Sequence, residues 1–336
     1  MTITRDQQIH KFLHDAGWAD AKRVPMREDA SARKYYRLQK QTQSAVLMDA
    51  APPFEEVGEF ARKAAIFSSY GLSIPKIYAR DDAHGLLLIE DYGEISFANA
   101  IRSGENGGGL YRDAIAALTH MHSQADIQAR KLPPLDDGRL IYLVSWIIEW
   151  YIPLIQPQTL SRTIREKFFE LWTDTFKIMR AVPHHAIHLD YQFHNLMLLP
   201  GKASYGRCGI LDFQDACYGP VSADLVMLLQ DAREDVPDNI VKTGLDQYLH
   251  AFPKINRDDF MASYAAFAAH NAARILGLFA RLKIRDGKGQ YLCHIPRNLK
   301  YFEDNLRHPA LAPIKQWFDT HVPAEKRLAI PDLKAA

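Results

Sequence analysis

The fold of this chain is decided by the stretch "HLDYQFHNLMLLP", residues 188–200, which sets Asp190 and Asn195 five positions apart ahead of an apolar run. A second short apolar run, "GILDF" at residues 209–213, carries Asp212. Phosphoryl transfer needs a carboxylate that orients the attacking hydroxyl, and oxygen ligands for the magnesium that bridges the nucleotide phosphates. The three residues, in this order, therefore predict a kinase-type centre with Asp190 as the base and with Asn195 and Asp212 as metal ligands.

The composition is that of a soluble globular enzyme, with 336 residues, 47% hydrophobic and 24% charged, and a formal net charge of +1. This balance provides no global field that would attract nucleic acid or an anionic membrane. Three cysteines without a C-x-x-C pair argue against a disulfide framework. The N-terminus is amphipathic and lacks the apolar core of a signal peptide. We expect a cytoplasmic protein whose partners are a nucleotide and a small-molecule acceptor.

The order of elements along the chain indicates two lobes. β-rich runs at 33–38 and 44–50, a helix ending at Gly71, and two strands around a turn at 81–85 predict a small antiparallel sheet with one helix. Later periodicity is mostly helical. The expected helices are 108–124, 139–151, 162–181, 221–232, 239–251, 257–283 and 290–305, with short strands between 186 and 213. The predicted fold is α+β and kinase-like, with a sheet lobe at 1–91 and a helical lobe at 92–336.

Two segments within this order have their own expectations. The stretch "SGENGGG" (103–109) is expected to be a flexible surface loop. The most apolar stretch, 141–155, is shorter than the roughly 20 residues that span a bilayer and is broken by Glu149 and Pro153. We therefore expect it to form a buried helix.

The central motifs resemble those of a known family. "HLDYQFHN" followed by "GILDFQDACYGPVSADL" is similar to the signature of the aminoglycoside and choline kinase-like phosphotransferases, H-x-D-x-x-x-x-N and then a strand ending in I-D-[WF]. The late stretch "RILGLFARLKIRDGKGQYLCHIPRNLKYFEDNLRHPAL" resembles one branch, the anomeric N-acetylmuramate/N-acetylglucosamine kinases of bacterial cell-wall recycling. The resemblance covers most of the chain.

The resemblance implies an ATP- and Mg²⁺-dependent transfer of the γ-phosphoryl group to a sugar hydroxyl, and it implies roles for further residues. His188 would brace the catalytic loop and Asp224 would buttress it. The loop at 29–38 would cover the nucleotide phosphates, and the connector would lie beside adenine. The nucleotide-binding residues expected in these two places are Ser31, Ala32, Arg33 and Lys34 in the loop, and Glu90 and Tyr92 in the connector.

One residue departs from the kinase pattern. Kinases place a lysine on the third strand to pair with the α- and β-phosphates, but "SAVLMDAAP" has Met48 at about that position. Either Arg33, Lys34 or Arg37 reaches in from the preceding hairpin, or the nucleotide is bound weakly. Met48 also motivates an alternative class, a non-catalytic nucleotide-binding regulator.

The acceptor is the least determined part of the prediction. The preferred acceptor is the anomeric hydroxyl of an N-acetylated amino sugar, and the alternatives are an aminoglycoside, choline or another alcohol. Glu149 and Trp150 can contact a sugar, although a core helix explains them as well. Arg274 can meet a lactyl carboxylate, although a solvated basic face is the simpler explanation.

The histidines around residue 188 suggest one further alternative. A zinc site among His184, His185, His188 and His194 is less favoured than histidines that brace the loop, because no third ligand recurs at a metal-site spacing.

Overall fold

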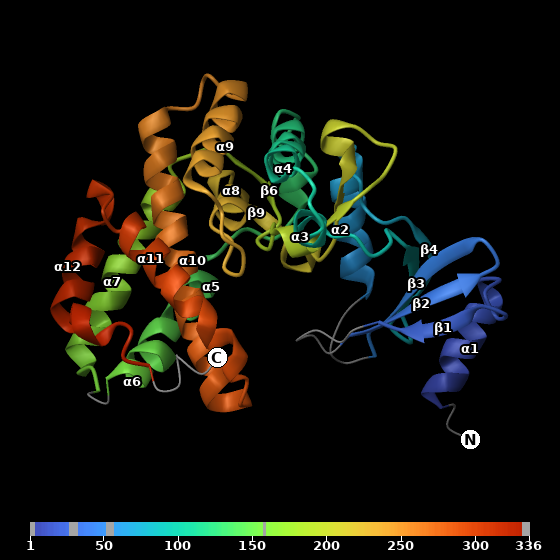
Figure 1. Cartoon of the computed structure of the whole chain (residues 1–336), viewed down its shortest axis with the longest axis horizontal. Coiled ribbons are helices and arrows are strands. Elements are labelled where there is room, and N and C mark those ends of the chain that lie inside the picture. Colours follow the sequence, from blue (N-terminus) through green and yellow to red (C-terminus); the bar gives the residue numbers. More distant parts are fainter. Residues whose placement is uncertain (1–3, 27–32, 52–56, 157–158, 331–336) are drawn as a thin grey trace. The chain divides into compact units, whose positions relative to one another are not determined.

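The computed structural model describes residues 4–26, 33–51, 57–156 and 159–330 (Figure 1). The chain packs as two compact units, which we describe separately. The first unit comprises Met1–Met121 and Phe193–Asp215, and the second comprises His122–Gln192 and Ala216–Ala336. The chain thus changes unit between Asp190 and Asn195. The lobe boundary predicted at residue 91 is a different division and stays a prediction.

The first unit contains an antiparallel sheet, as predicted, and the sheet has five strands where the sequence indicated four (Figure 1). The strand order is β1 (Lys22–Pro25), β2 (Lys34–Lys40), β3 (Gln43–Asp49), β5 (Leu86–Glu90) and β4 (Ile77–Asp81). Helix α1 (Arg5–Asp15) begins with a capping box between Thr4 and Gln7. Its apolar face packs on the sheet, because Ile9, Phe12 and Leu13 share one buried cluster with strand leucines.

Three helices and a second hairpin complete the first unit. Helix α2 (Val57–Ser69) ends just before Gly71, whose φ of 73° is the conformation predicted for a glycine stop. Helix α3 (Phe97–Arg102) precedes α4 (Gly107–His122). The expectation of a flexible loop is wrong for Gly107–Gly109, which lie in α4. The side chain of Asn106 accepts the N–H of Gly109 and so caps this helix despite its glycines.

The second hairpin consists of β7 (Leu196–Leu198) and β8 (Cys208–Ile210), paired antiparallel. Phe193 precedes it, and its ring contacts those of Phe97 and Tyr111, at centroid distances of 5.4 and 4.2 Å. The hairpin is therefore anchored to α3 and α4 by the residues just before it.

The second unit is mostly helical. It contains α5 (Asp137–Trp146), α6 (Ile152–Ile155), α7 (Arg162–Met179), α8 (Ser222–Leu229), α9 (Asp238–Ala251), α10 (Arg257–Asp286), α11 (Ile295–Asn305) and α12 (Ala312–His321). A two-stranded sheet pairs β6 (His184–Ile187) with β9 (Cys217–Pro220). Helix α10 packs against α5, α7, α8 and α11 and forms the centre of this unit (Figure 1).

One helical run in the described part of the chain, Asp137–Ile155, is long and apolar enough to cross a membrane by length and composition. Of its most apolar 18-residue window, 44% is buried inside the protein, and α10 packs along it. The expected helix is present, and it continues across Glu149 and Pro153, the two residues that interrupt the apolar sequence. A π-helical turn at Ile147–Tyr151 leads directly into α6, whose first turn contains Pro153.

Candidate active site

The two predicted metal ligands lie at the same end of the β7–β8 hairpin. Leu196 pairs with Ile210, so Asn195 directly precedes one strand and Asp212 follows the other. The backbone N–H of Leu211 donates to the carbonyl of Asn195 at 2.9 Å and extends the pairing by one residue. The hairpin thus places the backbones of two residues with oxygen-bearing side chains at one end, although they lie 17 positions apart in the sequence.

Asp212 has an uncommon backbone conformation. Its φ is 61°, in the left-handed region that costs a residue with a Cβ about 1–2 kcal/mol. The side-chain amide of Gln214 donates to its Oδ1. The next residue, Phe213, is fully buried, with its ring centroid 4.8 Å from that of Phe60 in α2. The carboxylate of Asp212 is therefore exposed on a turn whose neighbouring residue is fixed in the core.

The predicted base lies in the second unit, on a loop held by Asp224. Asp224 lies in the first turn of α8 and is fully buried. Its Oδ2 accepts the N–H of His188 at 2.7 Å and its Oδ1 accepts the N–H of Leu189 at 2.9 Å. Burial raises the pKa of Asp224, and His188 and the two N–H groups act in the opposite direction. Leu189 has a φ of 67°, which these bonds stabilise.

Asp190 itself is half-buried and is oriented by its neighbours. Its backbone N–H donates to Nδ1 of His188 at 3.2 Å, and its Oδ1 accepts from Nε2 of Gln192 at 2.9 Å. His188 is 1% exposed, so it contributes to the loop from inside the unit. Gln192 was not predicted. The sequence signal that could have identified Gln192 is a spacing that occurs twice. Asp190 and Asp212 are each followed two positions later by a glutamine whose side chain donates to the carboxylate.

The structure describes only some of the predicted nucleotide-binding residues. Ser31 and Ala32 lie outside the described residues. Arg33 donates to the hydroxyl of Tyr35 at 3.3 Å, and Lys34 is exposed at the start of β2.

The residues suggested around the missing strand lysine have defined surroundings. Met48 is 1% exposed in β3, and its Cα lies opposite those of Tyr35 and Leu87. Arg37 pairs with the carboxylates of Asp91 and Glu94 in the connector after β5. Two carboxylates therefore already neutralise the guanidinium of Arg37.

The connector residues are partly used by the first unit itself. The backbone N–H of Glu90 donates to the carbonyl of Lys76 at 2.8 Å, and Oε2 of Glu90 accepts the N–H of Lys76 at 3.2 Å. The ring of Tyr92 lies over Gly209 of β8, where an added Cβ would be 2.7 Å from Cδ2 of that ring. Burial raises the pKa of Tyr92. The part of Tyr92 that faces β8 is therefore already in contact with protein.

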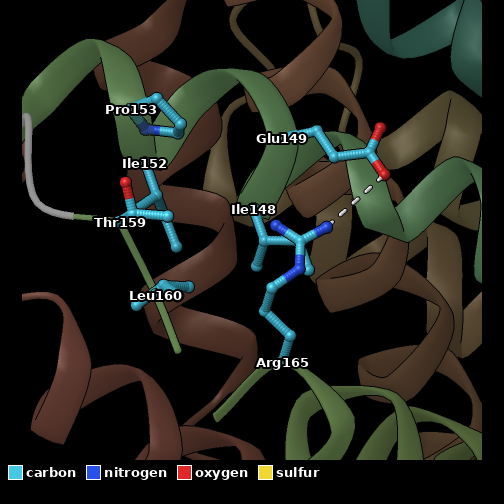
Figure 2. Close-up of a pocket in the computed structure, with 7 residues that line it drawn as sticks. All are labelled: Ile148, Glu149, Ile152, Pro153, Thr159, Leu160 and Arg165. Atoms are coloured by element: carbon cyan, nitrogen blue, oxygen red, sulfur yellow. Dashed lines mark ion pairs between the residues drawn. The ribbon is translucent and has the colours of Figure 1, made fainter. Parts of the chain in front are cut away.

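Of the three residues suggested for the acceptor, Glu149 lines the pocket shown in Figure 2. The pocket has a volume of about 200 Å³ and is lined by Ile148, Glu149, Ile152, Pro153, Thr159, Leu160 and Arg165. Arg165 was not predicted, and its Nη2 lies 3.9 Å from Oε1 of Glu149. Trp150, which follows Glu149 in the sequence, is half-buried. Arg274 donates to Oδ1 of Asn271, one turn earlier in α10.

Within the described ranges, no group of three or more His, Cys, Asp or Glu residues is arranged to hold a metal ion. The histidines near residue 188 are instead placed in strand β6 and the loop after it. The sequence also suggested Asn195 and Asp212 as magnesium ligands, and this assignment stays a prediction.

Comparisons with known proteins show the family and the fold of this chain. A model of the phosphotransferase enzyme family matches residues 22–264. An N-acetylmuramate/N-acetylglucosamine kinase of Caulobacter vibrioides is 34% identical over 97% of this chain and 100% of its own length. One of the same name from Pseudomonas aeruginosa is 31% identical over 92% of each chain. A streptomycin–ATP complex of the aminoglycoside phosphotransferase APH(2'')-IIa superposes with a TM-score of 0.56 at 14% identity, over 92% of this chain and 98% of that one. The predicted kinase-like fold is confirmed.

Proposed function

The chain belongs to the phosphotransferase enzyme family, and from this premise we propose that it transfers the γ-phosphoryl group of ATP to the anomeric hydroxyl of N-acetylmuramate or N-acetylglucosamine. The observation that carries the reaction class is the β7–β8 hairpin, which sets Asn195 beside Asp212 directly downstream of Asp190 in the chain. The acceptor is suggested by the names of relatives that align along nearly the whole chain.

The residues at the end of the hairpin fit magnesium. Mg²⁺ is bound by oxygen ligands, with one or two carboxylates and substrate phosphates completing its coordination. Asn195 and Asp212 offer an amide oxygen and a carboxylate, and the carboxylate of Asp212 is exposed. These two residues would hold the ion, which when bound neutralises charge on the nucleotide phosphates. ATP as the nucleotide is supported by the similarity in fold to the ATP-bound complex.

Asp190 would orient the acceptor hydroxyl and take its proton. Because Gln192 donates to Oδ1 at 2.9 Å, the orientation of this carboxylate is restrained, as a general base requires. An anomeric hydroxyl is more acidic than an ordinary alcohol because the ring oxygen withdraws charge. The base therefore needs to position this hydroxyl and accept its proton late in the transfer.

The test is ATP turnover with magnesium in the presence of N-acetylmuramate, N-acetylglucosamine, choline or kanamycin. Asp190→Asn should abolish turnover, whereas Asp246→Asn, the same change at an exposed position of α9, should leave it unchanged. A 1-O-methyl glycoside of N-acetylglucosamine should be inert, because its anomeric oxygen has no proton to give. Turnover of the methyl glycoside, or of choline and kanamycin alone, would refute the proposed acceptor.

A further inference from the structure

Lys63 is a buried lysine of α2, with 8% of its surface exposed. Burial of an ammonium group is costly unless the group is hydrogen-bonded. Its Nζ donates to the carbonyl oxygen of Gln214, 151 residues further along the chain. Phe60 and Phe67, which lie on the same side of α2, contact the ring of Phe213. Helix α2 therefore holds the turn after β8 through two rings and one ammonium, all within the first unit.

The contact of Lys63 reaches the predicted metal ligand through one residue. Gln214 accepts from Lys63 with its backbone carbonyl and donates to Oδ1 of Asp212 with its side chain. Asp212 needs such support, because its φ of 61° is unfavourable for a residue with a Cβ. Backbone conformations of this kind persist only where the surrounding structure holds them. Lys63 thus fixes the backbone of the residue that orients the carboxylate.

The position of this lysine is informative because the strand lysine is absent. In protein kinases an ion pair joins a lysine of the third strand to a glutamate of the following helix, and the metal-binding aspartate is held separately. Here β3 carries the buried Met48, and Glu59 of α2 pairs with Arg62 of the same helix. The helix that would supply the glutamate instead supplies a lysine to the turn that carries Asp212.

We propose that Lys63 is a positioning residue that couples α2 to Asp212 and sets the affinity of the site for magnesium-bound nucleotide. The proposal rests on the proposed function for the role of Asp212, and it assigns Lys63 and Gln214 to that site. It requires an N–H donor at position 63. Arginine at this position should therefore preserve much of the affinity, and methionine, which fills a similar volume without a donor, should not.

The experiment measures binding of ADP by isothermal titration calorimetry, with and without Mg²⁺, together with thermal unfolding of the unliganded protein. Lys63→Met should raise the dissociation constant of magnesium-bound ADP by about 10–100-fold, the range typical for partners that orient metal ligands. The dissociation constant of ADP without metal should hardly change. Lys63→Arg should recover most of the affinity. Arg62→Met, the matched change at the neighbouring, partly exposed position, should bind like the wild type.

A second variant keeps the proposal testable if Lys63→Met does not fold. Gln214→Ala leaves the bond from Lys63 to the backbone intact and removes only the amide that reaches Asp212, and it should weaken magnesium-dependent binding in the same way. If both variants lower the unfolding temperature but bind magnesium-bound ADP like the wild type, Lys63 is a purely structural residue and the proposal is wrong.

The two proposals fail separately. A wild type that phosphorylates none of the sugars, but binds magnesium-bound ADP in a way that depends on Lys63, refutes the acceptor and supports the coupling. A wild type that binds no magnesium-bound ADP refutes both.

Discussion

Replacing Asp224 with asparagine tests whether a buried carboxylate holds the loop that carries Asp190. The two carboxylate oxygens of Asp224 accept the N–H groups of His188 and Leu189, one each. An asparagine keeps one acceptor oxygen and presents an NH₂ group to the other N–H, so two donors face each other. The loop must then lose one of its two bonds or shift away from α8.

The size of the effect follows from the burial of these groups. A buried hydrogen bond to a charged acceptor contributes about 1.5–3 kcal/mol, and a buried N–H without a partner costs about 1–3 kcal/mol. Burial raises the pKa of Asp224, so the cost of burying its charge offsets part of the stability that these hydrogen bonds provide. The loss of stability should therefore lie in the lower half of the sum of these two contributions. We expect Asp224→Asn to lower the free energy of unfolding by about 2–4 kcal/mol.

Activity should fall as well, because Leu189 would lose the bond that maintains its φ of 67° next to the base. A displacement of about 1 Å at a reacting group can cost about 10²-fold in rate. We therefore expect kcat to fall by about 10–100-fold with little change in the KM for ATP.

The measurements are urea unfolding followed by far-ultraviolet circular dichroism, and steady-state kinetics on the folded protein. Asp246→Asn is the control, because Asp246 is an exposed helix residue that pairs with Lys242 and Arg257. Such surface pairs contribute about 0–1 kcal/mol. An Asp224→Asn protein with the wild-type urea midpoint and kcat would show that the loop does not depend on this carboxylate.

Three further predictions concern buried positions. Burial raises the pKa of Asp231 to about 6, so its contribution to folding is present at low pH and is lost as the pH rises from about 4 through 6. Between pH 4.5 and 7.5, the free energy of unfolding of Asp231→Asn should therefore rise by about 2 kcal/mol relative to that of the wild type, as measured by urea unfolding. A difference between the two proteins that does not depend on pH would contradict this. Gly277→Ala should lower stability by about 1–3 kcal/mol, since its Cβ would lie 2.3 Å from the backbone carbon of Trp146, and an unchanged unfolding temperature would argue against this packing. Gly209→Ala should displace the ring of Tyr92 and change ADP affinity if that ring lies beside adenine, whereas unchanged affinity would separate the ring from the nucleotide.

Much of the fold was predictable because its elements have strong local patterns. β2, β3, β4 and β5 are apolar or aromatic runs bounded by turns, and α2 ends at a glycine that adopts a positive φ. Strand β1 was not predicted, because four residues with two cations carry little pattern and pair only with β2. Helix α3 follows the cap residue Ser96 and has only six residues. A helix of this length is too short to be recognised from its apolar periodicity.

The candidate site was predictable where its chemistry depends on spacing within one segment. Asp190, Asn195 and Asp212 are recognised from residue types and intervals in a stretch of about two dozen residues. Lys63 could not be found in this way, because its contact with Gln214 joins positions 151 residues apart. The basic residues that the sequence offers in place of the strand lysine lie in the preceding hairpin. The structure pairs Arg37 of that hairpin with carboxylates instead.

The backbone segments that carry Asp190 and Asp212 are each held by one buried charged side chain, a carboxylate for Asp190 and an ammonium for Asp212. In each case an unfavourable backbone conformation lies at or just before the aspartate, and a glutamine two positions later bonds to the carboxylate. The loop of Asp190 is then tied to the core by its N–H groups, which donate to Asp224, and the turn of Asp212 by a carbonyl, which accepts from Lys63. Because backbone groups make these distant bonds, Asp224 and Lys63 hold the two segments without themselves bonding to the carboxylates that we propose meet substrate and metal. A change at either anchor should therefore alter the geometry of one carboxylate without occupying it, so loss of Asp224 should act mainly on turnover and loss of Lys63 mainly on metal affinity.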